Sequence, residues 1–139
     1  MNIIAIVVAA VAAFIIGFLF HGPLFGKLWM RLADVHPTGN EKFSDMWGQM
    51  LLNLLANIVT AGVISLLFWI LFSSPLMGPS AVSDALRGAI WGAWVWLGFV
   101  VTSSSMEVIW MKGSVKLWLF ECLASLVSFA AMGTIIAGW

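Results

Sequence analysis

The sequence predicts an all-α integral membrane protein: four transmembrane helices as two parallel-repeat helical hairpins, plus a short interfacial amphipathic helix after the first span. Three observations predict this fold class, namely an apolar composition, four long apolar segments and a similarity between the two halves of the chain. Hydrophobic residues make up 63% of the 139 residues and charged residues 9%, whereas soluble domains carry roughly 25% charged residues. We therefore expect a single membrane domain over residues 1–139, solvated mainly by the lipid bilayer.

The four apolar segments are each long enough to cross a hydrocarbon core, which takes about 20 helical residues. They cover residues 2–20, 47–72, 86–104 and 117–139. Their continuous apolar character favours helices over barrel strands. The first segment has no Lys or Arg before it and no polar cleavage region after it, so we expect a retained helix rather than a signal peptide.

The connection after the first span begins with Gly22-Pro23, which should end the helix because proline has no N–H to donate. Beyond it, apolar and charged side chains separate onto two faces of a helix. The apolar face holds Phe25, Leu28, Trp29 and Leu32, and the charged face holds Lys27, Arg31 and Asp34. This pattern is typical of a helix lying in the membrane interface. The spacing of Thr38 and Glu41 then fits a capping box that opens the next helix.

The basic residues predict the orientation of the chain. Five of the six Lys and Arg residues lie in the connections over residues 21–46 and 105–116, and only Arg87 lies on the other side. Basic loops are retained in the cytoplasm. We therefore expect these two connections to be cytoplasmic and both termini to be outside.

The two halves of the chain align without gaps. The segment from Gly17 to Arg31 matches the segment from Gly98 to Lys112, with identical Phe and Trp residues at equivalent positions. The run "NLLANIVT" from Asn53 likewise matches "ECLASLVS" from Glu121. We expect a duplication with repeats over about residues 1–72 and 86–139, related by an axis along the membrane normal.

Polar residues mark a candidate site where the second and fourth spans meet. They recur on one helical face of each span, at Gln49, Asn53, Asn57 and Thr60 and at Glu121, Ser125 and Ser128. Such a polar seam could consist of hydrogen bonds between the helices, or it could line a cavity open toward the cytoplasm. Glu121 is the only acid within a predicted span, which indicates a proton or cation role. The other interpretation, which we favour here, pairs it with Lys27, Arg31, Lys112 or Lys116.

Trp94 and Trp96 lie at depth in the third span and form a candidate aromatic lining. They either pack in the core or form a cage for a cationic ligand. Small residues recur every four positions at Ala5, Ala9, Ala13 and Gly17, and again at Gly88 and Gly92. Such faces allow close helix approach, either within the chain or in a homo-oligomer, for which a dimer is the first expectation.

Composition also excludes several classes of function. The net charge is zero, so nucleic acid is not an expected partner. One cysteine and two histidines offer no expected metal site, and no catalytic or cofactor-binding residues are predicted, so we do not expect an enzyme. Two classes remain: a transporter or binder of a lipophilic or cationic small molecule that uses the polar seam, and a structural or accessory protein that assembles through small-residue faces.

The run "FHGPLFGKLWMR" (residues 20–31) resembles the signature that follows the first helix in the uncharacterised membrane family called domain of unknown function 1761. The runs "WLGFVVTSSSMEVIW" and "MGTIIAGW" are similar to its later segments, so the resemblance covers nearly the whole chain. It implies a small four-helix protein of bacterial or archaeal type with no assigned activity, and it carries over no functional residues. Many relatives have a small polar residue near the proline where this chain has His21, so the resemblance implies no role for His21.

Overall fold

The regular secondary structure is helical throughout the part of the chain that the computed structural model describes, residues 2–37, 39, 46–74 and 82–139. The elements are α1 (Ile3–His21), α2 (Gly26–Leu32), α3 (Trp47–Phe72), α4 (Asp84–Val95), the π-helical segment η2 (Trp96–Val101), α5 (Thr102–Met111) and α6 (Val115–Gly138). Because α4, η2 and α5 run on from one another, four helices are long and apolar enough to cross a membrane. The all-α class is confirmed, and the four helices fit a multi-pass membrane protein.

The third span is longer than predicted and contains a wide turn. It covers residues 84–111 rather than 86–104, and the connection to α6 shrinks to residues 112–114. In a π-helical turn each N–H reaches the carbonyl five residues back. The hydroxyls of Thr102 and Ser103 donate to the carbonyls of Gly98 and Phe99, which lie in this turn. These two backbone oxygens therefore have donors without help from water.

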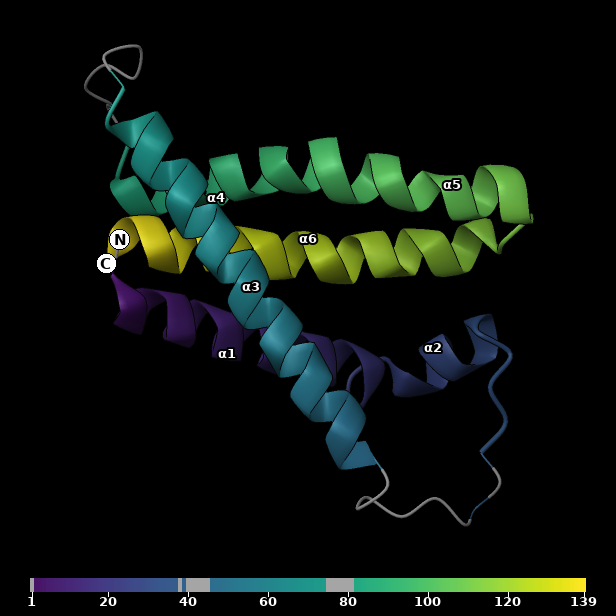
Figure 1. Cartoon of the computed structure of the whole chain (residues 1–139). Helices are drawn as coiled ribbons and strands as arrows, with labels where there is room; N and C mark the ends of the chain where they lie inside the picture. The colour runs from purple at the N-terminus through teal and green to yellow at the C-terminus, as the bar shows by residue number, and fades with distance from the viewer. Residues whose placement is uncertain (1, 38, 40–45, 75–81) are drawn as a thin grey trace.

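Small residues bring α6 against its neighbours. A side-chain carbon on Gly88 would overlap with the Gly133 carbonyl oxygen, and one on Gly92 would overlap with the Phe129 carbonyl oxygen. The backbones of α4 and α6 therefore touch at positions that exclude any larger residue. Ala5, Ala9 and Ala13 of the first small-residue face are also buried. These faces pack within one chain, and α6 lies between α1 and α4 (Figure 1).

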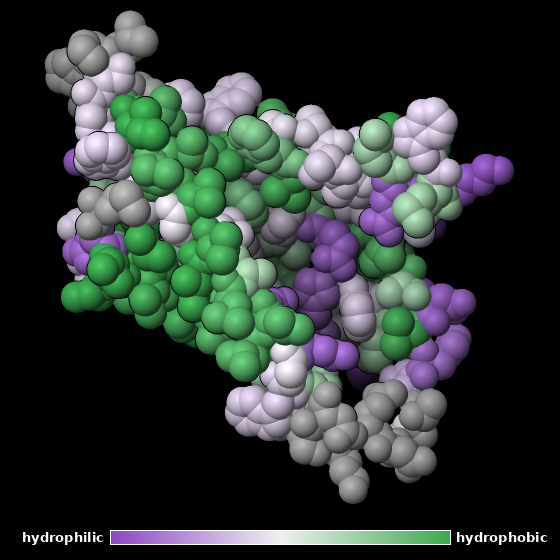
Figure 2. All heavy atoms as spheres, viewed as in Figure 1, coloured by the Kyte–Doolittle hydropathy of each residue, from purple (hydrophilic) through white to green (hydrophobic). Residues whose placement is uncertain are grey.

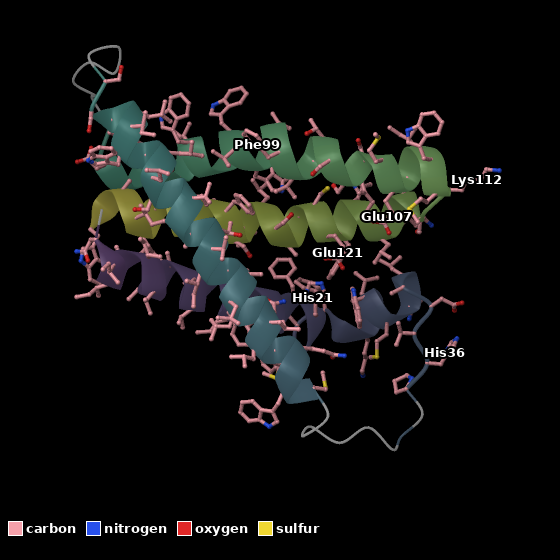
Figure 3. All side chains as sticks on the ribbon, in the orientation of Figure 1. His21, His36, Phe99, Glu107, Lys112 and Glu121 are labelled. Atoms are coloured by element: carbon pink, nitrogen blue, oxygen red, sulfur yellow. The ribbon has the colours of Figure 1, made fainter. Side chains whose placement is uncertain are left out.

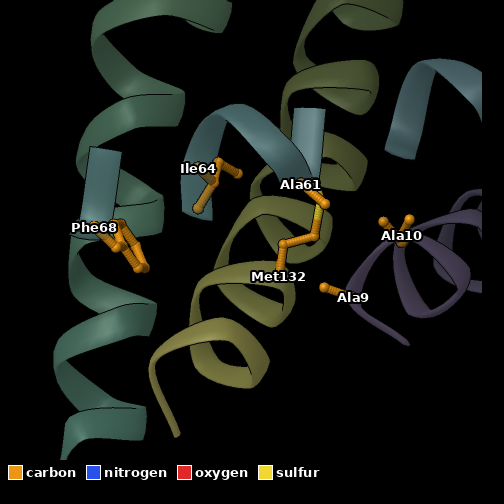
Figure 4. Close-up of a cluster of buried hydrophobic side chains, with 7 residues drawn as sticks. Ala9, Ala10, Ala61, Ile64, Phe68 and Met132 are labelled. Carbon is orange, nitrogen blue, oxygen red and sulfur yellow. The ribbon is translucent and has the colours of Figure 1, made fainter. Parts of the chain in front are cut away.

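The hydrophobic core lies where α1, α3 and α6 meet (Figure 4). Its buried members are Ala9, Ala10, Ala13, Ala61, Ile64, Phe68 and Met132. Three alanines on α1 leave room for the longer side chains of α3 and α6. Larger residues on α1 would force the three helices apart, since interiors are packed without spare volume.

The core includes only the second half of α3. Every buried residue of this helix lies between Ala61 and Phe68, and Figure 1 shows α3 crossing α1 and α6 diagonally. The first half, which carries Gln49, Asn53 and Asn57, is therefore free to border a space beside α1 and α6 rather than a tight seam.

The first span ends at His21, as the Gly22-Pro23 pair predicts. Pro23 has no N–H, and the Leu24 N–H takes over the Leu19 carbonyl at 3.0 Å. The chain then forms the short helix α2. Its position in the membrane interface stays a prediction, and the Thr38–Glu41 capping box falls outside the described residues.

The predicted duplication also stays a prediction, although the two halves differ at one point. The first half breaks at Pro23, whereas the second half continues through the equivalent position as α5. The described termini lie near each other at one end of the bundle (Figure 1), as an even number of spans requires.

Candidate functional site

Glu121 lies in the first half of α6 and contacts side chains from α1 and α2. The Nε2 atom of His21 is 3.0 Å from both carboxylate oxygens of Glu121. Trp29 Nε1 donates to Oε1 of the same carboxylate, also at 3.0 Å. Figure 3 shows His21 and Glu121 turned toward each other in the space between α1 and α6. These three residues, which we call the Glu121 triad, join segments about 100 positions apart in the chain.

The expectation that a Lys or Arg pairs with Glu121 is wrong. The described ion pairs join Glu121 to His21, Asp34 to His36, and Asp84 to Arg87. The physical reason lies in the faces of α2. At about 100° per residue, Lys27 and Arg31 share one side and Trp29 lies on the opposite one. Because α2 turns Trp29 toward α6, both basic side chains face outward and are exposed.

The imidazole of His21 is fixed on several sides. Its Nδ1 atom lies 2.8 Å from the carbonyl oxygen of Gly17, one turn back in α1. The rings of Trp29 and Phe120 meet it edge-on, with centroids 5.5 and 5.8 Å away. The ring orientation is therefore set by hydrogen bonds at both nitrogens and by aromatic contacts on its sides.

The polar seam lines a cavity of about 190 Å³ between α1, α3 and α6. Six of the seven predicted seam residues are in its wall: Asn53, Asn57, Thr60, Glu121, Ser125 and Ser128. His21 completes the polar lining, while Phe129 and Met132 provide apolar surface. Residues that the sequence separates by more than 60 positions thus come together here. Gln49 lies in an adjoining cavity of about 240 Å³ that shares Gly17, His21 and Asn53 with the first.

The seam side chains of Asn57, Thr60 and Ser128 bond within their own helices. Asn57 donates to Asn53, and Thr60 donates to the Ala56 carbonyl at 2.9 Å. Ser128 does the same on α6, to the Ala124 carbonyl at 3.1 Å. Such local bonds leave these side chains of α3 and α6 unjoined to each other, so a polar space remains between the two helices.

A further cavity of about 340 Å³ lies on the other side of Glu121, between α2, α5 and α6. Trp29, Glu107 and Trp118 line it together with Glu121. Trp118 donates to the Ser104 hydroxyl at 2.9 Å, which fixes one wall. Glu121 is thus shared by the cavities on both sides, and Figure 2 shows hydrophilic residues gathered in a hollow at this place.

The two candidate aromatic residues lie apart from this site. Trp94 and Trp96 border an apolar hollow of about 370 Å³ with Leu97 and Leu126, and none of these residues lines the Glu121 cavities. Trp96 donates to the Ser125 hydroxyl at 3.0 Å, while Trp94 is 59% exposed on the chain surface. Trp96 therefore contacts the seam through Ser125, and it does so without lining the cavity.

Sequence reasoning named Glu121 but not its partners, His21 and Trp29. Two signals pointed to them in retrospect: a titratable side chain just before a helix break, and a tryptophan opposite the basic face of an amphipathic helix. Chemically, the arrangement offers one titratable pair beside a polar cavity. The described residues contain no group of three or more His, Cys, Asp or Glu side chains placed to hold a metal ion.

Comparison with known proteins gives a family and no activity. No curated protein and no solved structure matches the chain. Residues 4–137 match the family model described as "Protein of unknown function (DUF1761)", as the resemblance after the first span indicated. The chain, matched over nearly its whole length, belongs to this family.

Proposed function

We propose that the protein is a membrane-embedded binder or transporter of a small lipophilic or cationic molecule, and that the ligand occupies the cavity between α1, α3 and α6. One observation supports this proposal above the others. Six seam residues from two distant helices line a single cavity of about 190 Å³, with a carboxylate and an imidazole in its wall. Ionisable groups at membrane depth mark substrate or ion pathways in many proteins.

A binder fits these residues better than an enzyme does. The cavity has amide, hydroxyl and carboxylate groups beside the apolar surface of Phe129 and Met132. Concave sites of this mixed kind orient a ligand with a few polar groups and hold it by apolar contact. Neither Ser125 nor Ser128 has a neighbouring base among the described contacts, since both hydroxyls donate to backbone carbonyls of α6. We therefore propose binding or transport without chemical conversion.

Assembly through small-residue faces is the alternative class of function. Those faces pack between helices of the same chain, so another surface would have to carry self-association. A dimer therefore stays a proposal, and it would have to form through a surface other than these faces. We also retain the proposed orientation, with the two basic connections in the cytoplasm, because it rests on the distribution of Lys and Arg.

The ligand proposal is tested by blocking the cavity. The melting temperature of purified protein in non-ionic detergent is measured in the presence of a series of tetraalkylammonium ions, and of neutral alcohols of matching size. A ligand at 100 times its dissociation constant adds about 2.7 kcal/mol to stability, which is a clear rise in melting temperature. Ser128→Leu fills the cavity and should abolish the rise.

Val127→Leu is the matched control for this test. Val127 neighbours Ser128 on α6 but is exposed and does not line the cavity, so its replacement leaves the cavity open. A rise that survives equally in both variants would place binding elsewhere. No rise with any member of either series would argue against the proposed ligand classes.

A further inference from the structure

The contacts of His21 determine how many protons it shares with Glu121. A backbone carbonyl oxygen can only accept a hydrogen bond. The Nδ1 atom lies 2.8 Å from the Gly17 carbonyl oxygen, so Nδ1 must carry the hydrogen. The other ring nitrogen, Nε2, then faces the two carboxylate oxygens of Glu121 at 3.0 Å each.

A hydrogen must also lie between Nε2 and the carboxyl group. If it is on Nε2, the pair is an imidazolium and a carboxylate, and if it is on the carboxyl group, both partners are neutral. The net charge of the pair is zero in either case. Without this proton, a nitrogen lone pair would face carboxylate lone pairs at 3.0 Å, which is repulsive. The observed contact is therefore the proton-loaded state of the pair.

The surroundings supply no permanent cation to Glu121 among the described residues. On α2, Trp29 donates a neutral N–H, while Lys27 and Arg31 face away. The α5 helix brings Glu107 to the neighbouring cavity, which adds negative charge. On α6, Cys122 is a buried thiol next to Glu121, and Lys116 is exposed. The α3 sequence contains no charged residue, and neither does that of η2.

We propose that His21 and Glu121 hold one proton between them and that a small monovalent organic cation in the α1/α3/α6 cavity displaces this proton and pairs with Glu121. This exchange rests on the proposed binding function and names the ligand class. The proton leaves to water, and the cation takes its place, so the pair with its ligand stays neutral. Neutrality matters because an unpaired charge at membrane depth is costly.

The cavity suits an organic cation on two counts. Phe129 contributes an aromatic ring to the lining, and alkylammonium ions are attracted to aromatic rings. Asn57, Thr60 and Ser128 offer oxygen and nitrogen atoms for a polar group on the same ligand. Trp29 keeps its bond to Oε1 after the proton has left, which holds the carboxylate in place for the incoming charge.

The shared proton can be observed without a ligand. The chain has two histidines, so His36→Gln leaves His21 as its only imidazole. Nitrogen chemical shifts of ¹⁵N-histidine in this variant report which ring nitrogen carries hydrogen. We expect Nδ1 to be protonated throughout, and the signal of Nε2 to change with pH in a way that Glu121→Gln alters. A neutral ring protonated only on Nε2 would overturn the shared proton.

The exchange is measured by calorimetric titration with choline, which carries a quaternary ammonium group and a hydroxyl group. Titrations in two buffers of different ionisation enthalpy give the number of protons released. We expect close to one proton per choline while the pair is loaded, and an apparent dissociation constant that falls about tenfold per pH unit there. Uncharged 3,3-dimethylbutan-1-ol has the same shape and should bind weakly and release no proton.

Two variants separate the exchange from the proposed function. Glu121→Gln should remove both choline binding and proton release, whereas Glu107→Gln, the matched acid in the neighbouring cavity, should keep both. Choline binding without proton release would overturn the exchange and leave the binding function standing. Equal binding of choline and the uncharged analogue would overturn the exchange, because it would show that the positive charge contributes nothing, and it would leave the binding function standing. No binding of either compound would overturn the exchange, and together with no rise in melting temperature in either ligand series it would overturn the binding function as well.

Discussion

The Glu121 triad makes the stability of the protein depend on pH, and Glu121→Gln should remove that dependence. In the wild type, loss of the shared proton turns an attraction at 3.0 Å into a repulsion. Stability is therefore fully present while the pair holds its proton and is lost as the pH rises past the point of release. The amide that Glu121→Gln introduces can donate to neutral Nε2 at any pH, so this variant mimics the loaded pair.

The magnitude follows from the contact and its exposure. A hydrogen bond to a charged group contributes about 1.5–3 kcal/mol when buried, and an exposed ion pair contributes about 0.2–1 kcal/mol. The side chains of His21 and Glu121 are 35% and 44% exposed in the isolated chain, so we expect a contribution of about 1 kcal/mol. For a chain of 139 residues this corresponds to a melting-temperature difference of roughly 4 °C.

The assay is thermal unfolding in non-ionic detergent between about pH 5 and pH 9, the range in which an imidazole commonly titrates. Glu107→Gln is the control, because Glu107 borders the neighbouring cavity without contacting His21, and it should keep the wild-type dependence. If the melting temperatures of the wild type and Glu121→Gln changed with pH in the same way across this range, the shared-proton reasoning would be refuted. A wild-type melting temperature that rises with pH would refute its sign.

Two further predictions concern the fold. Gly88→Ala places a carbon on top of the Gly133 carbonyl oxygen, so separating α4 from α6 should cost about 1–3 kcal/mol in detergent unfolding. Gly62→Ala has open space around it and should be neutral, and equal effects would contradict the close approach. For the orientation, cysteines introduced at Ser73 and Lys116 in a Cys122→Ala background should label from opposite sides of intact cells. Impermeant reagent should reach only the cysteine at Ser73, and labelling at Lys116 from outside would reverse the proposed topology.

The seam was largely predictable from the sequence. Residues spaced at i, i+4 and i+7 or i+8 occupy one face of a helix wherever the helix lies. That rule placed Asn53 and Asn57 on one wall and Glu121 and Ser125 on the other, and the structure brings these walls to one cavity. It could not say whether the walls bond to each other. That depends on the tilt of α3, which the alanines of α1 and the core around Ile64 set together.

The partners of Glu121 were not predictable in the same way. Counting charges favoured Lys or Arg, since five basic residues lie in the two connections on that side. Which side chain reaches Glu121 depends on the path of the backbone after Pro23, and the periodicity of the sequence does not specify that path. A change of one position in α2 would turn the helix by about 100° and bring another side chain toward α6. The bond from Trp29 to Glu121 therefore reflects the length of the turn between Gly22 and Gly26.

The π-helical turn of η2 explains why Trp96 and Ser104 both face α6, which they would not do on a regular α-helix. Trp96 and Ser104 are eight positions apart, so on an uninterrupted α-helix they would differ by about 80°. One extra residue in the wide turn removes about 100° from that angle and brings the two to within about 20°. Both then face α6, where Trp96 donates to Ser125 and Ser104 accepts from Trp118. These two bonds lie on either side of Glu121 along α6, so the π-helical turn holds the helix that carries the carboxylate at two points.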